Sequence, residues 1–255
     1  MNIKQKENVL NSKELFYPEA RFGGFTDIDG TMAFFNRVNA LIDLSFVVLD
    51  VGCGRGEYKD DSVHIRKSLR NLKGKVAKVI GIDVDQCAEN NPFLDEFHLI
   101  ESGPWPIEED SIDLVVCDNV LEHIGDPDLF FKEVRRVLRD SGFLCIRTPN
   151  RWSYVSLMAR LIPNKYHSRV ITLVQDGRKE EDVFPTFYNC NSIGKIKKMM
   201  KMYGLQCVVY GYESEPHYLS FSRIAYFFGV LHQRFAPGFM KPAIFAFGRL
   251  KKVIT

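Results

Sequence analysis

The chain has 255 residues, of which 45% are hydrophobic and 26% are charged, so it can bury the core of one large domain and is not intrinsically disordered. Its net charge of +2 excludes a polycation that coats nucleic acid. This small total conceals an asymmetry, because residues 216–255 carry +6 and contain no Asp or Glu, which leaves −4 on residues 1–215. The C-terminal segment is therefore a chemically distinct surface.

The six cysteines stand singly, without a C-x-x-C pair, at positions 53, 87, 117, 145, 190 and 207. This spacing fits neither a zinc ribbon nor a thioredoxin-like redox motif. Residues 1–21 lack the apolar core of a secretory signal, and no apolar run reaches the length of about 18 residues that a membrane span needs. We therefore expect a cytoplasmic protein with reduced thiols.

Hydrophobic spacing predicts a helix over residues 30–44 and then the alternation of strands and helices that is typical of a parallel sheet covered by helices. The expected strands are Phe46–Val51, Val76–Asp83, Phe97–Glu101, Ile112–Asp118 and Gly142–Thr148. The expected helices between them are Glu57–Leu72, Gln86–Asn91 and Pro127–Leu138. The last has the clearest start, because Asp126 can cap it and Pro127 suits its first position.

The alternation stops after residue 148. Residues 149–190 are rich in Pro, Tyr, His and Arg, and an insertion of this length is usually functional, so we interpret it as a lid or acceptor wall. A helix from Ser192 to Tyr203 and a strand over Leu205–Tyr212 should follow. The chain thus divides into an N-terminal helical cap (1–45), a core (46–148), the insertion (149–191), the last helix and strands of the core (192–222) and a basic, aromatic, helical extension (223–255).

The stretch VVLDVGCGRG at 47–56 leads a buried strand directly into Gly52, Gly54 and Gly56. Such a turn lets the backbone approach a ligand closely and presents N–H groups to it. A dinucleotide-binding fingerprint would need glycine at position 57, where the chain has Glu57, an acidic residue badly placed for a pyrophosphate. A polar cofactor without phosphates fits better.

The second expected strand ends in carboxylates, in the sequence VIGIDVD at 79–85. At the carboxyl edge of the sheet Asp83 can accept hydrogen bonds from both ribose hydroxyls of an adenosine. Asp85 is the alternative, and a simple turn aspartate is the structural explanation that competes with this role.

These stretches resemble the class I S-adenosylmethionine-dependent methyltransferases, in particular the group that includes ubiquinone-type and polysaccharide-associated enzymes. The matching blocks, in the family's order, are LDVGCGRG (49–56), GID (81–83), WPIEEDSIDLV (105–115), NVLEH (119–123), VRRVL (134–138) with SG (141–142), and RTPN (147–150). Together these blocks are specific for the family, whereas a glycine loop alone would not be. The resemblance implies an α/β, doubly wound, mainly parallel seven-stranded Rossmann-like sheet with helices on both faces, whose antiparallel seventh strand we expect near His217–Ser222, and S-adenosyl-L-methionine as the cofactor.

The resemblance also implies roles for individual residues. Those that would contact the methionine part of the cofactor, or the turn that holds it, are Asp50, Gly52, Cys53, Gly54 and Gly56. Those that would contact the adenosine are Asp83 at the ribose, Val84 beside it and Glu101 at the adenine amino group, while Asn119 would close over the cofactor.

His123 is the candidate catalytic base. A sulfonium methyl group is already activated, so the protein mainly has to align the acceptor and take a proton if the acceptor is a hydroxyl. An imidazole at the end of the fourth strand can do so near neutral pH, and Glu122 can orient it; the alternative is that Leu121–His123 merely begins the next turn. Relatives with E-x-x-E-H bind a divalent metal here, but Asn119 replaces the first Glu, so we expect no metal.

The chain lacks the motifs of base-methylating enzymes, Asn/Asp-Pro-Pro-Tyr and Pro-Cys, and its near-neutral charge also argues against a nucleic acid acceptor. A hydroxyl of a sugar, a glycan or another small molecule remains, which favours O-methylation in polysaccharide biosynthesis. Within the insertion, His167 and residues 182–188 are candidate acceptor contacts. Two other functions stay open: a nicotinamide-dependent oxidoreductase, which Glu57 disfavours, and a non-catalytic cofactor-binding protein.

Nine aromatic residues lie among the basic ones between Tyr218 and Phe247. Residues 218–252, interrupted by Pro237 and Pro242, can form short amphipathic helices on an anionic surface such as the inner face of the cell membrane, which would suit a lipid-linked acceptor. Packing against the body of the protein, or in a homodimer, is the alternative.

Overall fold

The computed structural model describes residues 13–101, 103–161 and 185–252. In this part of the chain seven strands form one sheet in the order β3-β2-β1-β4-β5-β7-β6. The strands are β1 (Val47–Val51), β2 (Lys78–Asp83), β3 (Glu96–Leu99), β4 (Ile112–Asp118), β5 (Leu138–Pro149), β6 (Leu205–Tyr212) and β7 (Ala243–Leu250). The first five pair in parallel, and β7 is antiparallel to both β5 and β6. The expected fold class is confirmed.

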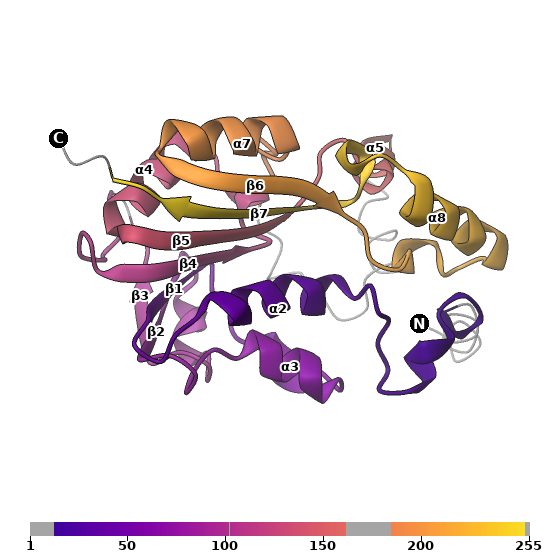
Figure 1. Ribbon diagram of the computed structural model, residues 1–255, viewed down its shortest axis with the longest axis horizontal. Coiled ribbons are helices and arrows are strands. Elements are labelled where there is room, and N and C mark those ends of the chain that lie inside the picture. Colours follow the sequence, from indigo (N-terminus) through magenta and orange to yellow (C-terminus); the bar gives the residue numbers. More distant parts are fainter. Residues whose placement is uncertain (1–12, 102, 162–184, 253–255) are drawn as a thin grey trace.

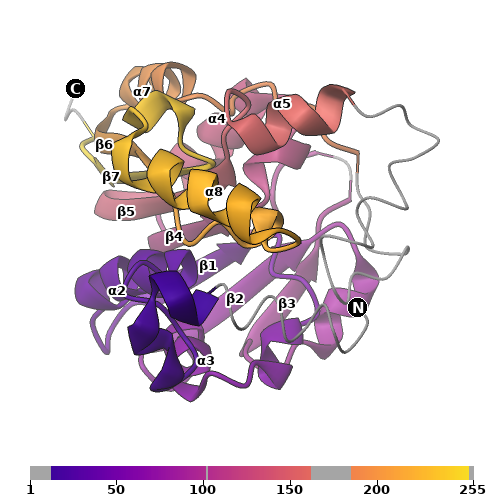
Figure 2. The same cartoon turned by 90° about the vertical axis from the view of Figure 1, so that its right-hand side faces the viewer.

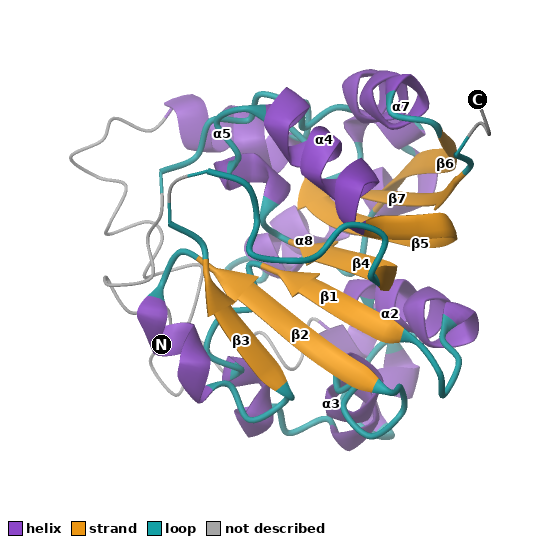
Figure 3. Ribbon diagram, turned by 90° about the vertical axis from the view of Figure 1, so that its left-hand side faces the viewer, coloured by secondary structure: helices purple, strands orange, loops and turns teal. Residues whose placement is uncertain are grey.

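The chain order of the strands reverses at β1, whose sheet neighbours are β2 and β4. In doubly wound sheets ligands bind outside the carboxyl ends of the strands at such a switch point. The arrowheads of β1, β2 and β3 lie together at this edge (Figure 3). The topology therefore assigns the binding site to the ends of β1, β2 and β4.

Helices cover both faces of the sheet (Figure 1). One face carries α2 (Gly30–Leu41) and α3 (His64–Arg70), and the other carries α4 (Pro127–Val137) and α7 (Ile193–Met202). Alternation along β1 explains the two layers, since Val48 packs in one buried cluster with Phe34 of α2 while Leu49 packs in the other with Phe131 of α4. The remaining helices, α5 (Tyr154–Leu161) and α8 (Arg223–Phe235), lie beyond the sheet at its carboxyl edge (Figures 1 and 2).

Short 3-10 turns make several of the connections: η1 (Pro18–Arg21), η2 (Glu57–Asp60), η3 (Gln86–Asn90), η4 (Leu121–His123), η6 (His217–Leu219) and η7 (Gly238–Met240). The expected cap of α4 is present, because the Asp126 carboxylate accepts hydrogen bonds from the backbone N–H groups of Asp128 and Leu129 at 3.0 and 3.1 Å. None of the described helices is long and apolar enough to cross a membrane.

The helix expected over Glu57–Leu72 is two elements, η2 and α3. Asp61 causes the interruption, because its carboxylate accepts the backbone N–H of Val63 at 2.9 Å and both Nε and Nη2 of Arg66 at 2.6 and 2.7 Å. A side chain that bonds the backbone two residues on forms a turn that competes with a continuing helix.

The position expected for the seventh strand, His217–Ser222, is wrong. These residues contain the η6 turn, and the seventh strand is Ala243–Leu250, within the segment expected to be a helical extension. β7 lies between β5 and β6, and Ile244, Phe245 and Ala246 are fully buried there. The strand is covered on both faces, so it lacks the apolar–polar alternation that identifies a half-buried strand.

Candidate active site

The glycine turn after β1 approaches its neighbours closely. Gly52, Gly54 and Gly56 have φ angles of +66°, +57° and +71°, a left-handed region that favours glycine. A Cβ on Gly52 would lie 2.4 Å from Cγ2 of Val120, the residue before η4. The turn therefore needs glycine both for its backbone angles and for its contact with the end of β4.

Asp83 fixes this turn against the end of β2. Its carboxylate accepts the backbone N–H of Gly54 at 2.9 Å and that of Asp85 at 2.9 Å, and the residue is only 8% exposed. On the other side of the turn the Asn91 amide donates to the carbonyl oxygens of Cys53 and Gly54, both at 3.0 Å. Each carboxylate oxygen can accept a second hydrogen bond, so Asp83 fits the predicted role at a ribose.

Asp85, the alternative to Asp83, is engaged elsewhere. Its carboxylate accepts Nε and Nη2 of Arg55 at 3.0 and 2.7 Å and caps η3 through the backbone N–H of Cys87 at 2.9 Å. These contacts give Asp85 a structural role and leave Asp83 as the better candidate for the predicted ribose contact.

A pocket beneath the glycine turn brings an acidic and a basic side chain together. It is lined by Asp50, Gly52 and Cys53, which the sequence identified, and by Tyr58, Arg70 and Asp118, which it did not. Burial, together with the nearby Asp118 carboxylate, raises the pKa of Asp50 to about 7.

Arg70 offers this pocket an unsatisfied donor. Its Nε is buried without a hydrogen-bond partner, and its guanidinium lies 4.3 Å from the ring centroid of Tyr58. A carboxyl group that accepts hydrogen bonds and a guanidinium that donates them are the two partners that an amino-acid group, with its ammonium and carboxylate, requires. The site therefore fits the methionine end of S-adenosylmethionine.

Asp118, at the end of β4, forms a nearly buried ion pair with Arg147 of β5. Nε and Nη2 of Arg147 lie 2.6 and 2.7 Å from the two carboxylate oxygens, and both side chains are 11% exposed. The remaining Nη1 donates to the Thr31 hydroxyl of α2 at 2.8 Å. The pair joins the ends of two strands to α2 beside the pocket.

The remaining predicted cofactor contacts lie around the same edge. Asn119 is exposed, has φ +56° and donates its backbone N–H to the Arg147 carbonyl at 2.8 Å. Val84 follows Asp83 and is 60% exposed. Glu101 is exposed two residues after β3. Their roles stay predictions, which this placement supports.

Glu122, in the η4 turn, is only 5% exposed and bonds to two other parts of the chain. Its carboxylate accepts the Thr148 hydroxyl at 3.0 Å, and Thr148 in turn accepts the Asn191 amide at 2.6 Å. Its backbone carbonyl accepts the N–H groups of Phe187 and Tyr188 at 2.8 and 3.2 Å. Burial raises the pKa of the Glu122 carboxyl. Glu122 thus joins η4 to β5 and to residues 187–191.

The ring of His123 is oriented by a backbone carbonyl, since Nδ1 lies 2.9 Å from the carbonyl oxygen of Pro185. A carbonyl oxygen only accepts hydrogen bonds, so Nδ1 carries a proton and the lone pair of the neutral ring is on Nε2. This Nε2 lies 3.9 Å from Oε1 of Glu122. His167 and residues 182–184, also predicted as acceptor contacts, lie outside the described residues.

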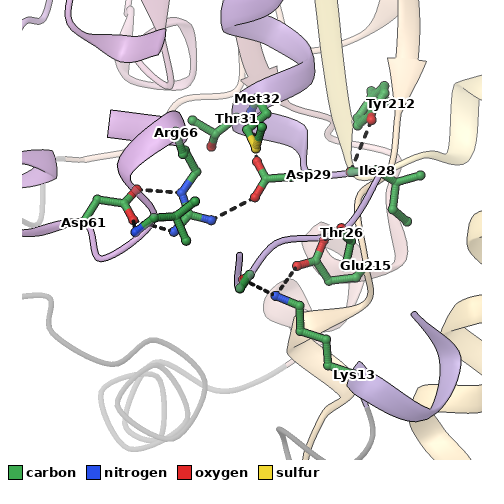
Figure 4. A network of polar contacts seen from close by, with 12 residues as sticks. Lys13, Thr26, Ile28, Asp29, Thr31, Met32, Asp61, Arg66, Tyr212 and Glu215 are labelled. Carbon is green, nitrogen blue, oxygen red and sulfur yellow. Dashed lines mark hydrogen bonds and ion pairs between the residues drawn. The ribbon is translucent and has the colours of Figure 1, made fainter. Parts of the chain in front are cut away.

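A polar network joins the N-terminal segment to α3 and to the chain after β6 (Figure 4). Arg66 of α3 donates to Asp29 at 2.8 Å, and Asp29 caps α2 through the Met32 N–H at 2.9 Å. Farther along, Glu215 accepts the Thr26 hydroxyl at 2.9 Å and pairs with Lys13 at 3.5 Å. The network fixes α2 and α3, which carry Phe35 and Arg70 into the pocket.

No cluster of three His, Cys, Asp or Glu side chains suited to a metal occurs among the described residues.

Residues 28–209 match the family model described as a methyltransferase domain. The chain belongs to this family. The resemblance to class I S-adenosylmethionine-dependent methyltransferases is confirmed.

Several relatives share part of the chain. A protein of Mycobacterium tuberculosis named "Probable S-adenosylmethionine-dependent methyltransferase" is 34% identical over 129 residues, which are 48% of this chain and 42% of that protein. The ubiquinone biosynthesis O-methyltransferase of Leptothrix cholodnii is 29% identical over 117 residues, 41% of this chain and 44% of that enzyme. The matches therefore span less than half the length of these relatives.

Solved structures share the fold at low sequence identity. A SAM-dependent methyltransferase from Thermotoga maritima has a TM-score of 0.52 at 13% identity, covering 97% of this chain and 99% of that one. Geranyl diphosphate methyltransferase, solved with GPP and sinefungin, has a TM-score of 0.52 at 16% identity, covering 86% of this chain and 76% of that one.

Proposed function

We propose that this chain transfers a methyl group from S-adenosylmethionine to a hydroxyl of a sugar, a glycan or another small molecule, with His123 as the base. The observation that carries the proposal is the contact between His123 Nδ1 and the Pro185 carbonyl at 2.9 Å. It orients an imidazole, with the lone pair of the neutral ring on Nε2, in the η4 turn, which directly follows the Val120 that Gly52 contacts.

The proposed cofactor contacts follow from the hydrogen-bond donors and acceptors at the site. Asp83 would accept the ribose hydroxyls, the Gly52–Gly54 backbone would lie against the methionine part, and Asp50 and Arg70 would take its ammonium and its carboxylate. When bound, S-adenosylmethionine supplies a methyl group on a positively charged sulfur, which needs no further activation. The protein's remaining tasks are to align the acceptor and to take up a proton.

His123 performs the second task in this proposal. Its Nε2 would accept the hydroxyl proton as the acceptor oxygen bonds the methyl carbon and the bond from that carbon to sulfur breaks, which would leave neutral S-adenosylhomocysteine. The Nδ1–H bond to Pro185 would stabilise the resulting imidazolium. Glu122 is a positioning residue, since its carboxylate bonds Thr148 and lies 3.9 Å from the ring.

Oxygen is the proposed acceptor atom for two reasons. A base is useful for a hydroxyl, which must lose its proton, and several relatives, including that of Leptothrix cholodnii, are named ubiquinone biosynthesis O-methyltransferases. The choice of a sugar or glycan, and the role in polysaccharide biosynthesis, rest on the resemblance of the sequence motifs.

The test begins with calorimetric titration of S-adenosylmethionine, S-adenosylhomocysteine and NADH into the wild-type protein, Asp83→Asn and Asp85→Asn. We expect micromolar binding of the first two ligands, at least about tenfold weaker binding by Asp83→Asn and little change in Asp85→Asn. A preference for NADH would overturn the cofactor assignment.

Acceptors are then screened by the release of S-adenosylhomocysteine in the presence of sugar nucleotides, glycans and phenolic hydroxyl compounds. Turnover with a hydroxyl acceptor that depends on His123 supports the proposal. Turnover only with amine acceptors would overturn O-methylation, and cofactor binding without any methyl transfer would favour a non-catalytic binding protein.

A further inference from the structure

Large apolar side chains gather on the outer side of α8 and on the residues that flank it. The exposed fractions are 71% for Phe221, 72% for Ile224, 62% for Phe228, 78% for Phe235 and 60% for Phe239. The ring of Phe227, 44% exposed, lies 5.7 Å from that of Phe228. Single exposed apolar residues are ordinary, whereas a cluster of them marks an interaction surface.

The spacing places these side chains on one side of the helix. Ile224, Phe227, Phe228 and Phe235, with the half-buried Leu231, follow the i, i+3, i+4, i+7, i+11 pattern of a single helical face. We call Phe221, this helical face and Phe239 the α8 surface.

The body of the protein already occupies the other side of α8. Tyr226 and Val230 are buried in a cluster with Tyr17, and a Cβ on Gly229 would lie 2.5 Å from Pro216. The helix therefore has two apolar sides, and the α8 surface is the one that its own chain leaves exposed in the described residues.

Positive charge borders the α8 surface. Arg223 and Arg234 are both exposed and stand eleven residues apart, about three helical turns, so they lie on the same flank of the apolar face. The chain contains no Asp or Glu between Pro216 and Thr255. An anionic partner is thus favoured.

The α8 surface also lies at the functional end of the molecule. α8 is beyond the carboxyl edge of the sheet, beside α5 (Figure 2), and the two helices are in contact through Tyr154 and His232, whose ring centroids are 4.9 Å apart. α5 follows β5 by only a few residues. A partner bound to α8 would therefore be at the same edge as His123.

We propose that the α8 surface docks on an anionic lipid surface. A helix with an aromatic and aliphatic face, an arginine flank and no acidic residue has the composition of an interfacial helix, in which the apolar side chains enter the headgroup boundary while the arginines meet lipid phosphates. The docking proposal depends only on the α8 surface and not on the proposed function. The corollary that the methylated hydroxyl belongs to a membrane-borne acceptor rests on the proposed function.

The test is co-sedimentation of the full chain with phosphatidylcholine vesicles, with or without about one third phosphatidylglycerol. We expect binding to the anionic vesicles only, weakening as ionic strength rises from about 0.05 to about 0.5 M. The double variant Phe228→Ser/Phe235→Ser should bind at least about tenfold more weakly, and Arg223→Gln/Arg234→Gln should lose most of the preference for anionic vesicles.

Matched controls alter equally exposed residues elsewhere. Leu44→Ser changes an apolar residue that is 77% exposed, and Arg37→Gln/Lys198→Gln removes two exposed charges from α2 and α7; all three substitutions should leave vesicle binding unchanged. Circular dichroism and calorimetric cofactor binding establish that each variant is folded, and they report on the proposed function independently of lipid.

Three results would overturn the docking proposal. The first is an absence of binding to anionic vesicles, and the second is binding that persists in Phe228→Ser/Phe235→Ser. The third is a concentration-dependent dimer in light scattering that this variant abolishes while vesicle binding is absent, which would assign the α8 surface to a second copy of the chain.

Discussion

His123 Nδ1 lies 2.9 Å from the carbonyl oxygen of Pro185, a residue 62 positions farther along the chain. The η4 turn after β4 and the last part of the insertion thus meet at the candidate base. His123→Gln keeps a polar side chain but removes the base, so we expect kcat to fall by about 10²- to 10⁴-fold with cofactor affinity unchanged.

Steady-state kinetics and calorimetry measure these two effects separately. The matched control is His64→Gln at an exposed position of α3, which should leave both quantities as in the wild type. A kcat within a factor of about two of wild type in His123→Gln would remove His123 from the chemical step.

The glycine turn can be tested with two alanine variants. Gly52→Ala forces a residue with φ +66° to carry a Cβ 2.4 Å from Val120, and we expect the free energy of unfolding to fall by about 2–4 kcal/mol and cofactor binding to be lost. Gly74 has φ +81° but no atom within 4 Å of the added Cβ, so Gly74→Ala should cost only about 1 kcal/mol. Equal losses in urea titrations would show that the close contact at Gly52 is unimportant.

Asp50 should make stability depend on pH. Its pKa is about 7 in the folded protein, against about 3.9 in an unfolded chain, so the folded state holds this proton more tightly. The stabilisation is complete below about pH 4 and is lost as pH rises through about 7.

Asp50→Asn cannot ionise, so its free energy of unfolding relative to wild type should rise by up to about 4 kcal/mol between pH 4 and pH 8. Thermal or urea unfolding at both pH values measures the change. Asp60→Asn, at an exposed carboxylate, is the control for the loss of one acidic side chain. A pH-independent difference for Asp50→Asn would mean that Asp50 ionises normally.

The ion pair between Asp118 and Arg147 should be costly to break. Asp118→Asn leaves the Arg147 guanidinium nearly buried without its counter-charge, and we expect a loss of about 3–5 kcal/mol. The exposed pair between Arg21 and Glu14, at 3.2 Å, provides the comparison, since Glu14→Gln should cost less than about 1 kcal/mol. Urea titrations that give similar losses would contradict the burial argument.

Local patterns predicted most of the sheet. β4 and β6 have the predicted bounds, and β1 begins one residue later than expected, because apolar alternation and turn residues are local signals. The pairing of β7 with β5 and β6 is a long-range relationship that no local pattern contains. The interruption between η2 and α3 also escaped prediction, since it depends on how Asp61 meets Arg66.

The residues of the candidate site also fall into those that local sequence patterns predict and those that only long-range packing brings to the site. Asp50, Gly52, Gly54 and Asp83 end strands that the sequence reveals, so their convergence follows from the topology. Asp118 carries the same signal, a carboxylate at the end of a strand, and could have been identified by it. Arg70 lies on a helix, and only the packing of α3 brings it to the pocket.

The position of β7 constrains how the protein is made. Among the described strands β6 pairs with β7 alone, and β7 is inserted between β6 and β5. During synthesis the edges of β5 and β6 that pair with β7 therefore lack their hydrogen-bond partner until residues 243–250 have left the ribosome. The parallel strands that carry the glycine turn and Asp83 can assemble earlier, because domains begin to fold from the N-terminal side during translation.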